Sequence, residues 1–223
     1  MSSPESQRGR RRFLRALFGL GGAATTRGAA AQQTGAGGGF SLPSYARLQN
    51  YRSLKQSSYN RTGRNADRYK VDPGGAIEVF NSEGPGVITH IWFTISTPAP
   101  NHLKEVVLRA YWDGEASPSI ETPVGDFFGL NLGQYFVYQS AFLNCSSVRA
   151  LNCYFVMPFR RSARLTATNE GKQPVPGFYV NIDYQIVPSL PDDAAYFHAQ
   201  YRQATPTPPT MTNWQTNRDG NEA

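Results

Sequence analysis

Reactive and charged side chains are scarce in this chain of 223 residues. Only 17% of the residues are charged, and there are two cysteines and three histidines. No spacing of cysteine and histidine resembles a zinc site. Phosphate-binding loops and the sequence motifs of serine or cysteine nucleophiles are also missing. We therefore expect neither a bound metal nor a cofactor.

Long apolar runs are missing as well. Residues 16–24 form a short, weakly apolar stretch with three glycines, whereas a helix that spans a bilayer needs about 20 apolar residues. We therefore expect no stable membrane anchor. The stretch fits an export signal instead, because Arg10-Arg11-Arg12-Phe13-Leu14-Arg15 precedes it and Ala29-Ala30-Ala31 follows it. This order predicts a twin-arginine signal peptide over residues 1–31 and a periplasmic or extracellular location. A basic disordered tail is the alternative.

The part of the chain after residue 31 carries almost no excess of positive charge. The net charge of +6 arises mainly in residues 1–31, which hold six arginines and one acid, and the residues after them carry a net charge of +1. Such a chain lacks the basic footprint of a nucleic-acid-binding protein. A nearly neutral protein rich in tyrosine and phenylalanine suits uncharged polar ligands. We expect carbohydrate, and not nucleic acid, as its partner.

The two cysteines, Cys145 and Cys153, are separated by seven residues. A hairpin could bring them together, and an exported protein tolerates a disulfide. Cysteine is also common as a small buried hydrophobe. Both alternatives stay open.

Alternation of residue type with period two runs through the middle of the chain, and long stripes with period 3.6 are absent. Separated by turn residues, the predicted strands are 76–80, 87–95, 106–112, 119–124, 135–142, 152–159, 163–168 and 178–186. Strand 87–95 is apolar on both sides, so it should be central. Its Trp92, like Trp112, is expected in the core, with His90 as a core histidine whose hydrogen bonds are satisfied. About eight antiparallel strands predict an all-β fold, a jelly-roll β-sandwich. Helix is expected only in short turns, one near residues 45–49.

Five segments carry a family resemblance. In chain order they are Ser57-Ser-Tyr-Asn-Arg-Thr-Gly-Arg-Asn-Ala-Asp67; Gly84-Pro-Gly-Val-Ile-Thr-His-Ile-Trp92; Tyr111-Trp-Asp-Gly114 with Gly125-Asp-Phe-Phe-Gly129; Met157-Pro-Phe-Arg-Arg-Ser-Ala-Arg164 with Asn169-Glu170; and Tyr196-Phe-His-Ala-Gln-Tyr-Arg202. Together they resemble the N-terminal half of glycoside hydrolase family 172, earlier catalogued as domain of unknown function 2961. The resemblance runs from about Tyr45 to the C-terminus.

This resemblance implies an exo-acting furanosidase on arabinofuranosyl or fructofuranosyl linkages. It also implies two jelly rolls in each subunit and assembly into trimers or multiples of trimers. The family's two catalytic glutamates lie in Gly-Glu-Gly-Asp and Gly-Thr-Glu-Asp-Tyr motifs of the second half, and neither motif occurs in this sequence. We therefore expect a truncated chain that is inactive alone and prone to associate. A stand-alone carbohydrate-binding or assembly jelly roll is the alternative.

The expected organisation follows from these observations. A flexible lead-in rich in glycine covers residues 32–40, and the jelly-roll domain covers residues 41–202. Residues 203–223 are rich in proline, threonine and asparagine, which predicts a linker to a missing second jelly roll.

The segment Gly125-Asp126-Phe127-Phe128-Gly129 is the first candidate for a binding site. Rings stack on the C–H faces of sugars and carboxylates accept hydrogen bonds from hydroxyls, so Asp126, Phe127 and Phe128 could bind substrate. The alternative is that both phenylalanines are core residues and Asp126 caps a turn.

Two further groups could bind substrate. His198 and Arg202, four residues apart, could bind a hydroxyl and orient a carboxylate, or form a structural network. In the loop over residues 61–67, Arg61, Asn65 and Asp67 could contact a ligand or a neighbouring subunit, or be merely solvated. We expect no catalytic residue in this chain, and Asp113 beside Gly114 is typical of a turn former and not of an acid.

Overall fold

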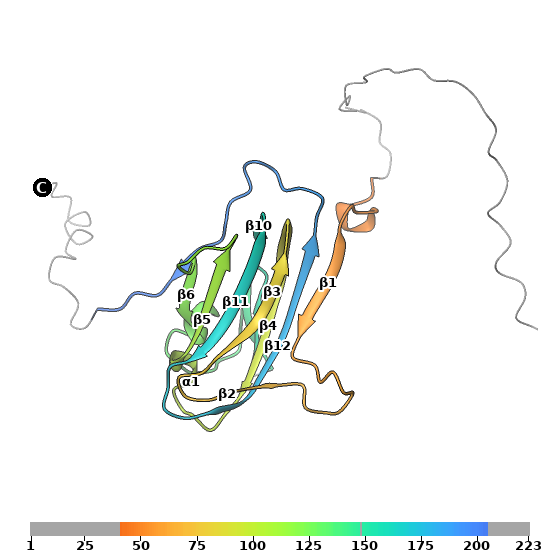
Figure 1. Ribbon diagram of the computed structural model, residues 1–223. Helices are drawn as coiled ribbons and strands as arrows, with labels where there is room; N and C mark the ends of the chain where they lie inside the picture. The colour runs from red at the N-terminus through yellow and green to blue at the C-terminus, as the bar shows by residue number, and fades with distance from the viewer. Residues whose placement is uncertain (1–40, 148, 205–223) are drawn as a thin grey trace, which may run out of the picture. The chain divides into compact units, whose positions relative to one another are not determined.

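The structure is a computed structural model that describes residues 41–147 and 149–204 (Figure 1). The predicted signal peptide and lead-in, and most of the predicted linker, lie outside the described residues. Contacts divide the chain into two units. The first ends at Arg47 and contains the described 3-10 helix η1 (Ser44–Ala46), in the region where a helical turn was expected.

The second unit begins at Leu48, and its described residues form two β-sheets and two short helices, α1 (His102–Glu105) and α2 (Val124–Phe127). No helix within the described ranges has the length and apolar character needed to cross a membrane. The strands are β1 (Arg52–Ser57), β2 (Tyr69–Val71), β3 (Ala76–Glu83), β4 (Gly86–Ser96), β5 (Val106–Trp112), β6 (Ile120–Pro123), β7 (Tyr138–Gln139), β8 (Leu143–Ser146), β9 (Ala150–Cys153), β10 (Met157–Phe159), β11 (Ser162–Asn169), β12 (Val175–Ile186) and β13 (Ala199–Gln200).

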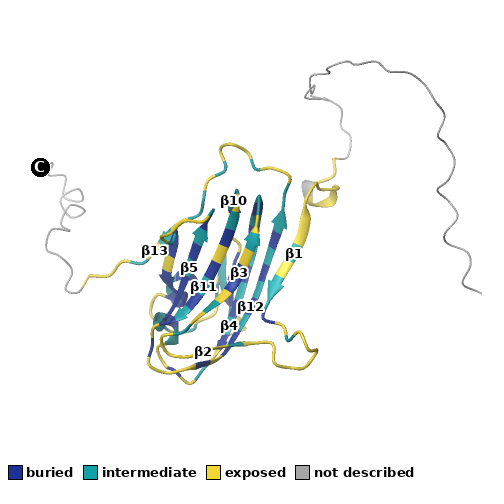
Figure 2. Cartoon of the chain, in the orientation of Figure 1, coloured by how far each residue is buried: buried dark blue, intermediate teal, exposed yellow. Residues whose placement is uncertain are grey.

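The two sheets enclose the core. The eight-stranded sheet has the order β1-β12-β4-β9-β8-β7, with β10 paired to β4 and β2 paired to β12, and the five-stranded sheet has the order β13-β6-β5-β11-β3. Buried and less buried residues alternate along β11 and β12, because each strand turns every second side chain inward (Figure 2). The predicted all-β sandwich is confirmed. The jelly-roll topology stays a prediction.

Six predicted strands correspond to observed ones, and β5 begins and ends as predicted. The predicted strand 135–142 is wrong, because only β7 forms there. The predicted strand 152–159 is broken into β9 and β10. Both pair with β4, with Cys153 opposite Ile91 and Met157 opposite Ile88. From Cys153 to Met157 the chain advances four residues, whereas from Ile91 to Ile88 strand β4 covers three. The segment between β9 and β10 therefore has one residue too many to stay paired, and residues 154–156 leave the sheet.

A bulge in β4 changes which side chains face the core. Asp183 pairs with His90 and Tyr184 pairs with Ile88, so Thr89 is an extra residue on β4. The alternation predicted for this strand fails before Ile91, because Ile88 is fully buried. His90 has its hydrogen bonds satisfied, as expected, but it lies half-buried on the outer face.

The two predicted core tryptophans differ. Trp112 is fully buried and donates its indole N–H to the Phe197 carbonyl at 2.8 Å. Trp92 is half-buried and pairs with Asn181, which alternates with the buried Val180 and Ile182. Trp92 therefore faces outward, and its assignment to the core was wrong.

No disulfide joins Cys145 and Cys153, although both are buried. Cys145 lies opposite Leu151 and Cys153 opposite Leu143, so the cysteines are diagonal neighbours. Diagonal neighbours are about 7–8 Å apart, whereas a disulfide needs α-carbons within about 6.8 Å. Burial raises the pKa of the Cys153 thiol to about 12.

We expect both thiols to resist dithiobis-nitrobenzoate in the folded protein, because the thiolate is the reactive form and burial raises the pKa of each cysteine. Addition of guanidinium should release two thiols per chain. Rapid release of both thiols without denaturant would contradict this packing.

The edge strand β3 is contacted by a side chain of the other sheet. The Gln56 amide nitrogen donates to the Asn81 carbonyl at 2.7 Å, and the Gln56 amide oxygen accepts from the Asn81 backbone N–H at 3.1 Å. Both main-chain groups of Asn81 on this side are therefore occupied.

Candidate functional site

An open hollow of about 910 Å³ lies beside β13, at one edge of the five-stranded sheet. Its walls come from α1, β6, α2, β13 and the residues that follow β13. The lining residues are Lys104, Thr122, Pro123, Asp126, Phe127, Asn131, Phe155, Phe197, Ala199, Gln200, Tyr201, Arg202 and Gln203.

The helical turn α2 presents Asp126 to this hollow. A β-carbon at Gly125 would lie 2.8 Å from both the β-carbon and the carbonyl oxygen of Leu103. Glycine at this position therefore allows α2 to pack closely against α1. Gly129, at φ +74°, follows the turn. Successive residues of a helix point about 100° apart, so Asp126 borders the hollow while Phe128 enters the core.

An ion pair borders the hollow. The Lys104 Nζ lies 2.7 Å and 2.9 Å from the two Asp126 carboxylate oxygens. The Asp126 side chain is 10% exposed and that of Lys104 is 34% exposed. The Lys104 Nζ also lies 5.4 Å from the centroid of the Tyr201 ring, within the range of a cation–π contact. The arrangement holds a hydrogen-bond donor, a hydrogen-bond acceptor and a ring close together.

Aromatic rings form a second part of the lining. The centroid of Phe197 lies 5.1 Å from that of Phe155 and 6.5 Å from that of Phe127. Phe155 also stacks on Phe142 at 4.7 Å. The hollow therefore combines apolar ring surface with a few fixed polar groups, the usual composition of a small-molecule site.

The carboxylate of Asp113 fixes the segment that carries Phe197. Asp113 Oδ1 accepts hydrogen bonds from the backbone N–H groups of Arg160, Arg161 and Ser162 at 3.0, 2.7 and 3.1 Å, and Oδ2 accepts from the Tyr196 hydroxyl. Burial raises the pKa of Asp113, but these hydrogen bonds outweigh burial and hold the pKa below its ordinary value. The φ of +55° at Asp113 fits the expected turn former.

Arg160 holds the same segment from the other side. Its guanidinium donates to the carbonyls of Pro191, Asp192 and Ala194 at 3.0–3.2 Å. Trp112 also donates to the Phe197 carbonyl. The contacts of Asp113, Arg160 and Trp112 therefore join the sequence motifs at residues 111–114, 157–164 and 196–202 at one wall of the hollow.

A family model described as GH172 domain-like matches residues 61–181, which is more than half of the chain. The chain belongs to the GH172 domain-like family. The domain is therefore related to glycoside hydrolases.

Other comparisons add little to this assignment of the GH172 domain. No curated protein matches it. A solved structure with some likeness is that of infectious bursal disease virus, Gt strain, with 11% identity and a TM-score of 0.24. The match covers 77% of this chain and 49% of the viral chain. A TM-score this low carries no argument about fold or function.

Three of the predicted site residues of the GH172 domain line the hollow, namely Asp126, Phe127 and Arg202. Phe128 is fully buried, with its centroid 5.6 Å from that of Phe93 in the core. His198 is exposed and is not part of the lining.

The predicted loop residues lie elsewhere in the GH172 domain. Arg61 lines a second hollow of about 330 Å³ formed mainly by residues of β1 and β3, and β3 is the opposite edge of the five-stranded sheet from β13. Asp67 accepts the Asn60 backbone N–H at 2.6 Å, which closes the loop, and Asn65 is exposed.

The sequence prediction missed Lys104, Phe155, Phe197 and Tyr201 as lining residues of the GH172 domain. Tyr201 and Phe197 belong to the same motif as Arg202, so their rings were a usable signal. Lys104 gave no such signal, since it meets Asp126 across 22 positions of sequence. No group of three metal-ligating side chains occurs among the residues that the structure describes.

Proposed function

We propose that this GH172 domain is the N-terminal module of an exported glycoside hydrolase that acts on furanosides. In this proposal the hollow beside Lys104 and Asp126 binds one furanosyl unit. The observation that carries the proposal is the ion pair at 2.7 Å set among the rings of Phe127, Phe155, Phe197 and Tyr201.

The composition of the hollow supports a sugar as ligand. Its volume of about 910 Å³ lies within the range of small-molecule sites. A sugar hydroxyl both donates and accepts hydrogen bonds, and Lys104 and Asp126 offer one partner of each kind. Lys104 and Asp126 balance each other's charge, and Arg202 adds a further hydrogen-bond donor to the lining. The rings offer apolar surface to the C–H groups of the sugar.

The lining supports binding without hydrolysis. Asp126 is the only carboxylate that lines the hollow in the described part of the chain, and Lys104 holds it. Glycosidases of both stereochemical classes commonly use two carboxyl groups. We infer that the catalytic pair belongs to another part of the enzyme. The furanoside class, export by the twin-arginine route and assembly into trimers extend the proposal and rest on the sequence patterns.

The hollow can be tested by substitution in the full chain. Asp126→Ala should weaken binding of arabinofuranosyl or fructofuranosyl oligosaccharides about tenfold or more, because it removes an acceptor and leaves the Lys104 ammonium without its partner. Isothermal titration calorimetry measures this change. Glu83→Gln is the matched control, since it alters an exposed carboxylate on β3.

Two results would contradict the proposal. Equal binding by the wild type and Asp126→Ala would remove the hollow as the sugar site. Turnover of a furanoside by the full chain that disappears in Asp126→Asn would show that the hollow itself catalyses hydrolysis.

A further inference from the structure

The outer face of the eight-stranded sheet carries a polar and aromatic surface remote from the core. Tyr179, Asn181 and Asp183 of β12 alternate with the buried Val180 and Ile182 and therefore point outward. Their partners on β4 are Thr94, Trp92 and His90. On the next strands Asn152 lies opposite Trp92, and Asn144 lies opposite Asn152. The outward side chains of these rows are amides, hydroxyls, rings and the Asp183 carboxylate, without leucine, isoleucine or methionine.

Three aromatic residues follow a diagonal across this face. Tyr179 of β12 lies opposite Thr94 of β4, and Trp92 lies two residues from Thr94 on that strand. Tyr154 directly follows β9, the next strand, and lies beside His90. Strands are about 4.8 Å apart and two residues rise about 6.8 Å, so the positions of Tyr179 and Trp92 are about 8 Å apart. Tyr154 lies beyond the end of β9, and its ring is placed by its stacking on His90.

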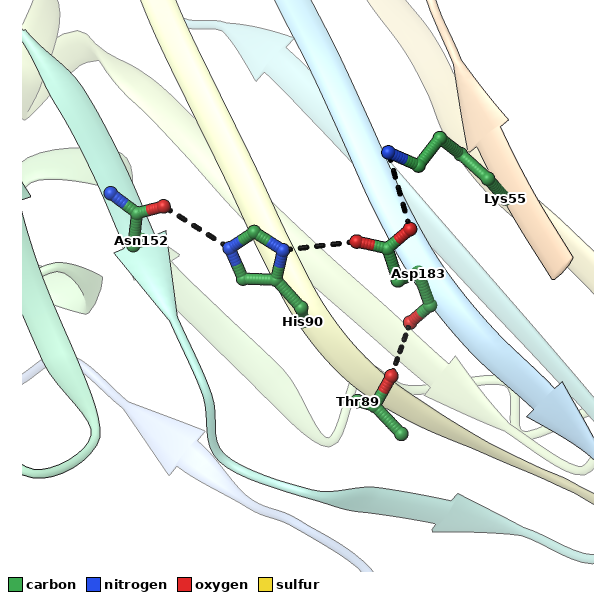
Figure 3. Close-up of polar contacts among 5 residues, drawn as sticks. All are labelled: Lys55, Thr89, His90, Asn152 and Asp183. Atoms are coloured by element: carbon green, nitrogen blue, oxygen red, sulfur yellow. Dashed lines mark hydrogen bonds and ion pairs between the residues drawn. The ribbon is translucent and has the colours of Figure 1, made fainter. Parts of the chain in front are cut away.

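The Tyr154 ring rests on a fixed support. His90 contacts Asp183 through Nδ1 and Asn152 through Nε2, each at 3.1 Å, and Lys55 lies 3.3 Å from the other Asp183 oxygen (Figure 3). Tyr154 stacks on His90 with a centroid distance of 4.6 Å and an interplanar angle of 9°.

The stack leaves a ring face of Tyr154 available. Tyr154 is 44% exposed although His90 covers one of its faces, so much of the exposed surface belongs to the opposite face. Its orientation is set before any ligand arrives, which lowers the entropic cost of binding.

We propose that this outer face binds a neutral carbohydrate chain along the diagonal of Tyr154, Trp92 and Tyr179. The rings stack on the C–H faces of successive sugars, and Asn181 and Asp183 bond their hydroxyls. The charges of Lys55 and Asp183 balance each other, which favours an uncharged ligand. The lack of aliphatic side chains in these rows distinguishes this face from the apolar centre of a protein interface. This surface is separate from the hollow and does not depend on the function proposed for it.

The test uses the full chain in an Asp126→Ala background, so that the hollow contributes little to binding. Affinity electrophoresis in gels that contain arabinan, levan or xylan measures retardation. We expect retardation by at least one polymer, and an association constant about tenfold lower for Tyr154→Ala and for Trp92→Ala. Tyr154→Phe keeps the ring and should bind as before. Tyr51→Ala, which removes a tyrosine that is 40% exposed elsewhere, is the matched control.

Circular dichroism confirms that each variant is folded, and Tyr154→Ala remains informative if Trp92→Ala unfolds. Absence of retardation in all three gels overturns the proposal, as does equal retardation of Tyr154→Ala and its parent. If Tyr154→Ala changes the sedimentation of the protein and not its retardation, a second copy of the chain occupies this face and the proposal is wrong.

Discussion

Replacement of Phe128 by alanine should lower the free energy of unfolding by about 4 kcal/mol. The ring is fully buried and makes edge contacts with Phe93 and Phe127 at 5.6 and 5.0 Å, so its removal leaves a cavity between the sheets. In a domain of this size such a loss lowers the melting temperature by about 8–16 °C. Thermal unfolding followed by circular dichroism measures this effect.

Phe136→Ala is the matched control, because Phe136 is 44% exposed. Its effect on the free energy of unfolding should stay within about 0.5 kcal/mol. The sequence alone left two alternatives for Phe128, contact with a sugar and a position in the core. A Phe128→Ala variant with an unchanged melting temperature and weakened sugar binding would support that contact and contradict the position in the core.

Replacement of Asp113 by alanine should lower the free energy of unfolding by about 2 kcal/mol at neutral pH. The variant loses a charged acceptor of three backbone N–H groups and of the Tyr196 hydroxyl. It should also loosen the wall of the hollow that carries Phe197. Urea unfolding of both proteins from pH 7 to pH 2 measures the loss.

The pH dependence has a definite sign. The folded protein holds the pKa of Asp113 below its ordinary value, so the contribution of the carboxylate is complete above the unfolded pKa of about 4. It disappears as the pH falls through the lowered pKa. The difference between wild type and Asp113→Ala should therefore shrink below pH 4. A difference that grows in acid would contradict the network, and Glu115→Ala in the same turn is the control.

The long strands could be predicted from sequence because their alternation reflects their own burial. β5, for example, has apolar residues at most positions and is mostly buried. β1 could not be predicted in this way, since Arg52–Ser57 is largely polar and exposed. Its strand conformation depends on pairing with β12, a partner more than 100 positions away. Local pattern carries no information about such pairing.

Part of the hollow could be predicted as well. The chemistry of Asp126 beside phenylalanine rings was visible in the sequence, and Asp126 and Phe127 do line the hollow. The different directions of Phe127 and Phe128 could not be predicted, because they depend on a single helical turn within a glycine-flanked segment. The burial of Ile88 depends on one extra residue in β4, Thr89, and one residue is enough to exchange the two faces of a strand.

The contact between Gln56 and Asn81 bears on aggregation. The free edge of a β-sheet exposes unpaired main-chain groups that can recruit a strand from another molecule. Gln56 offers its amide as a substitute for one residue of such a strand, because it donates to the carbonyl and accepts from the N–H of the same residue of β3. A single side chain thus interrupts the template for intermolecular sheet growth at that position, without the charge or proline that edge strands often use.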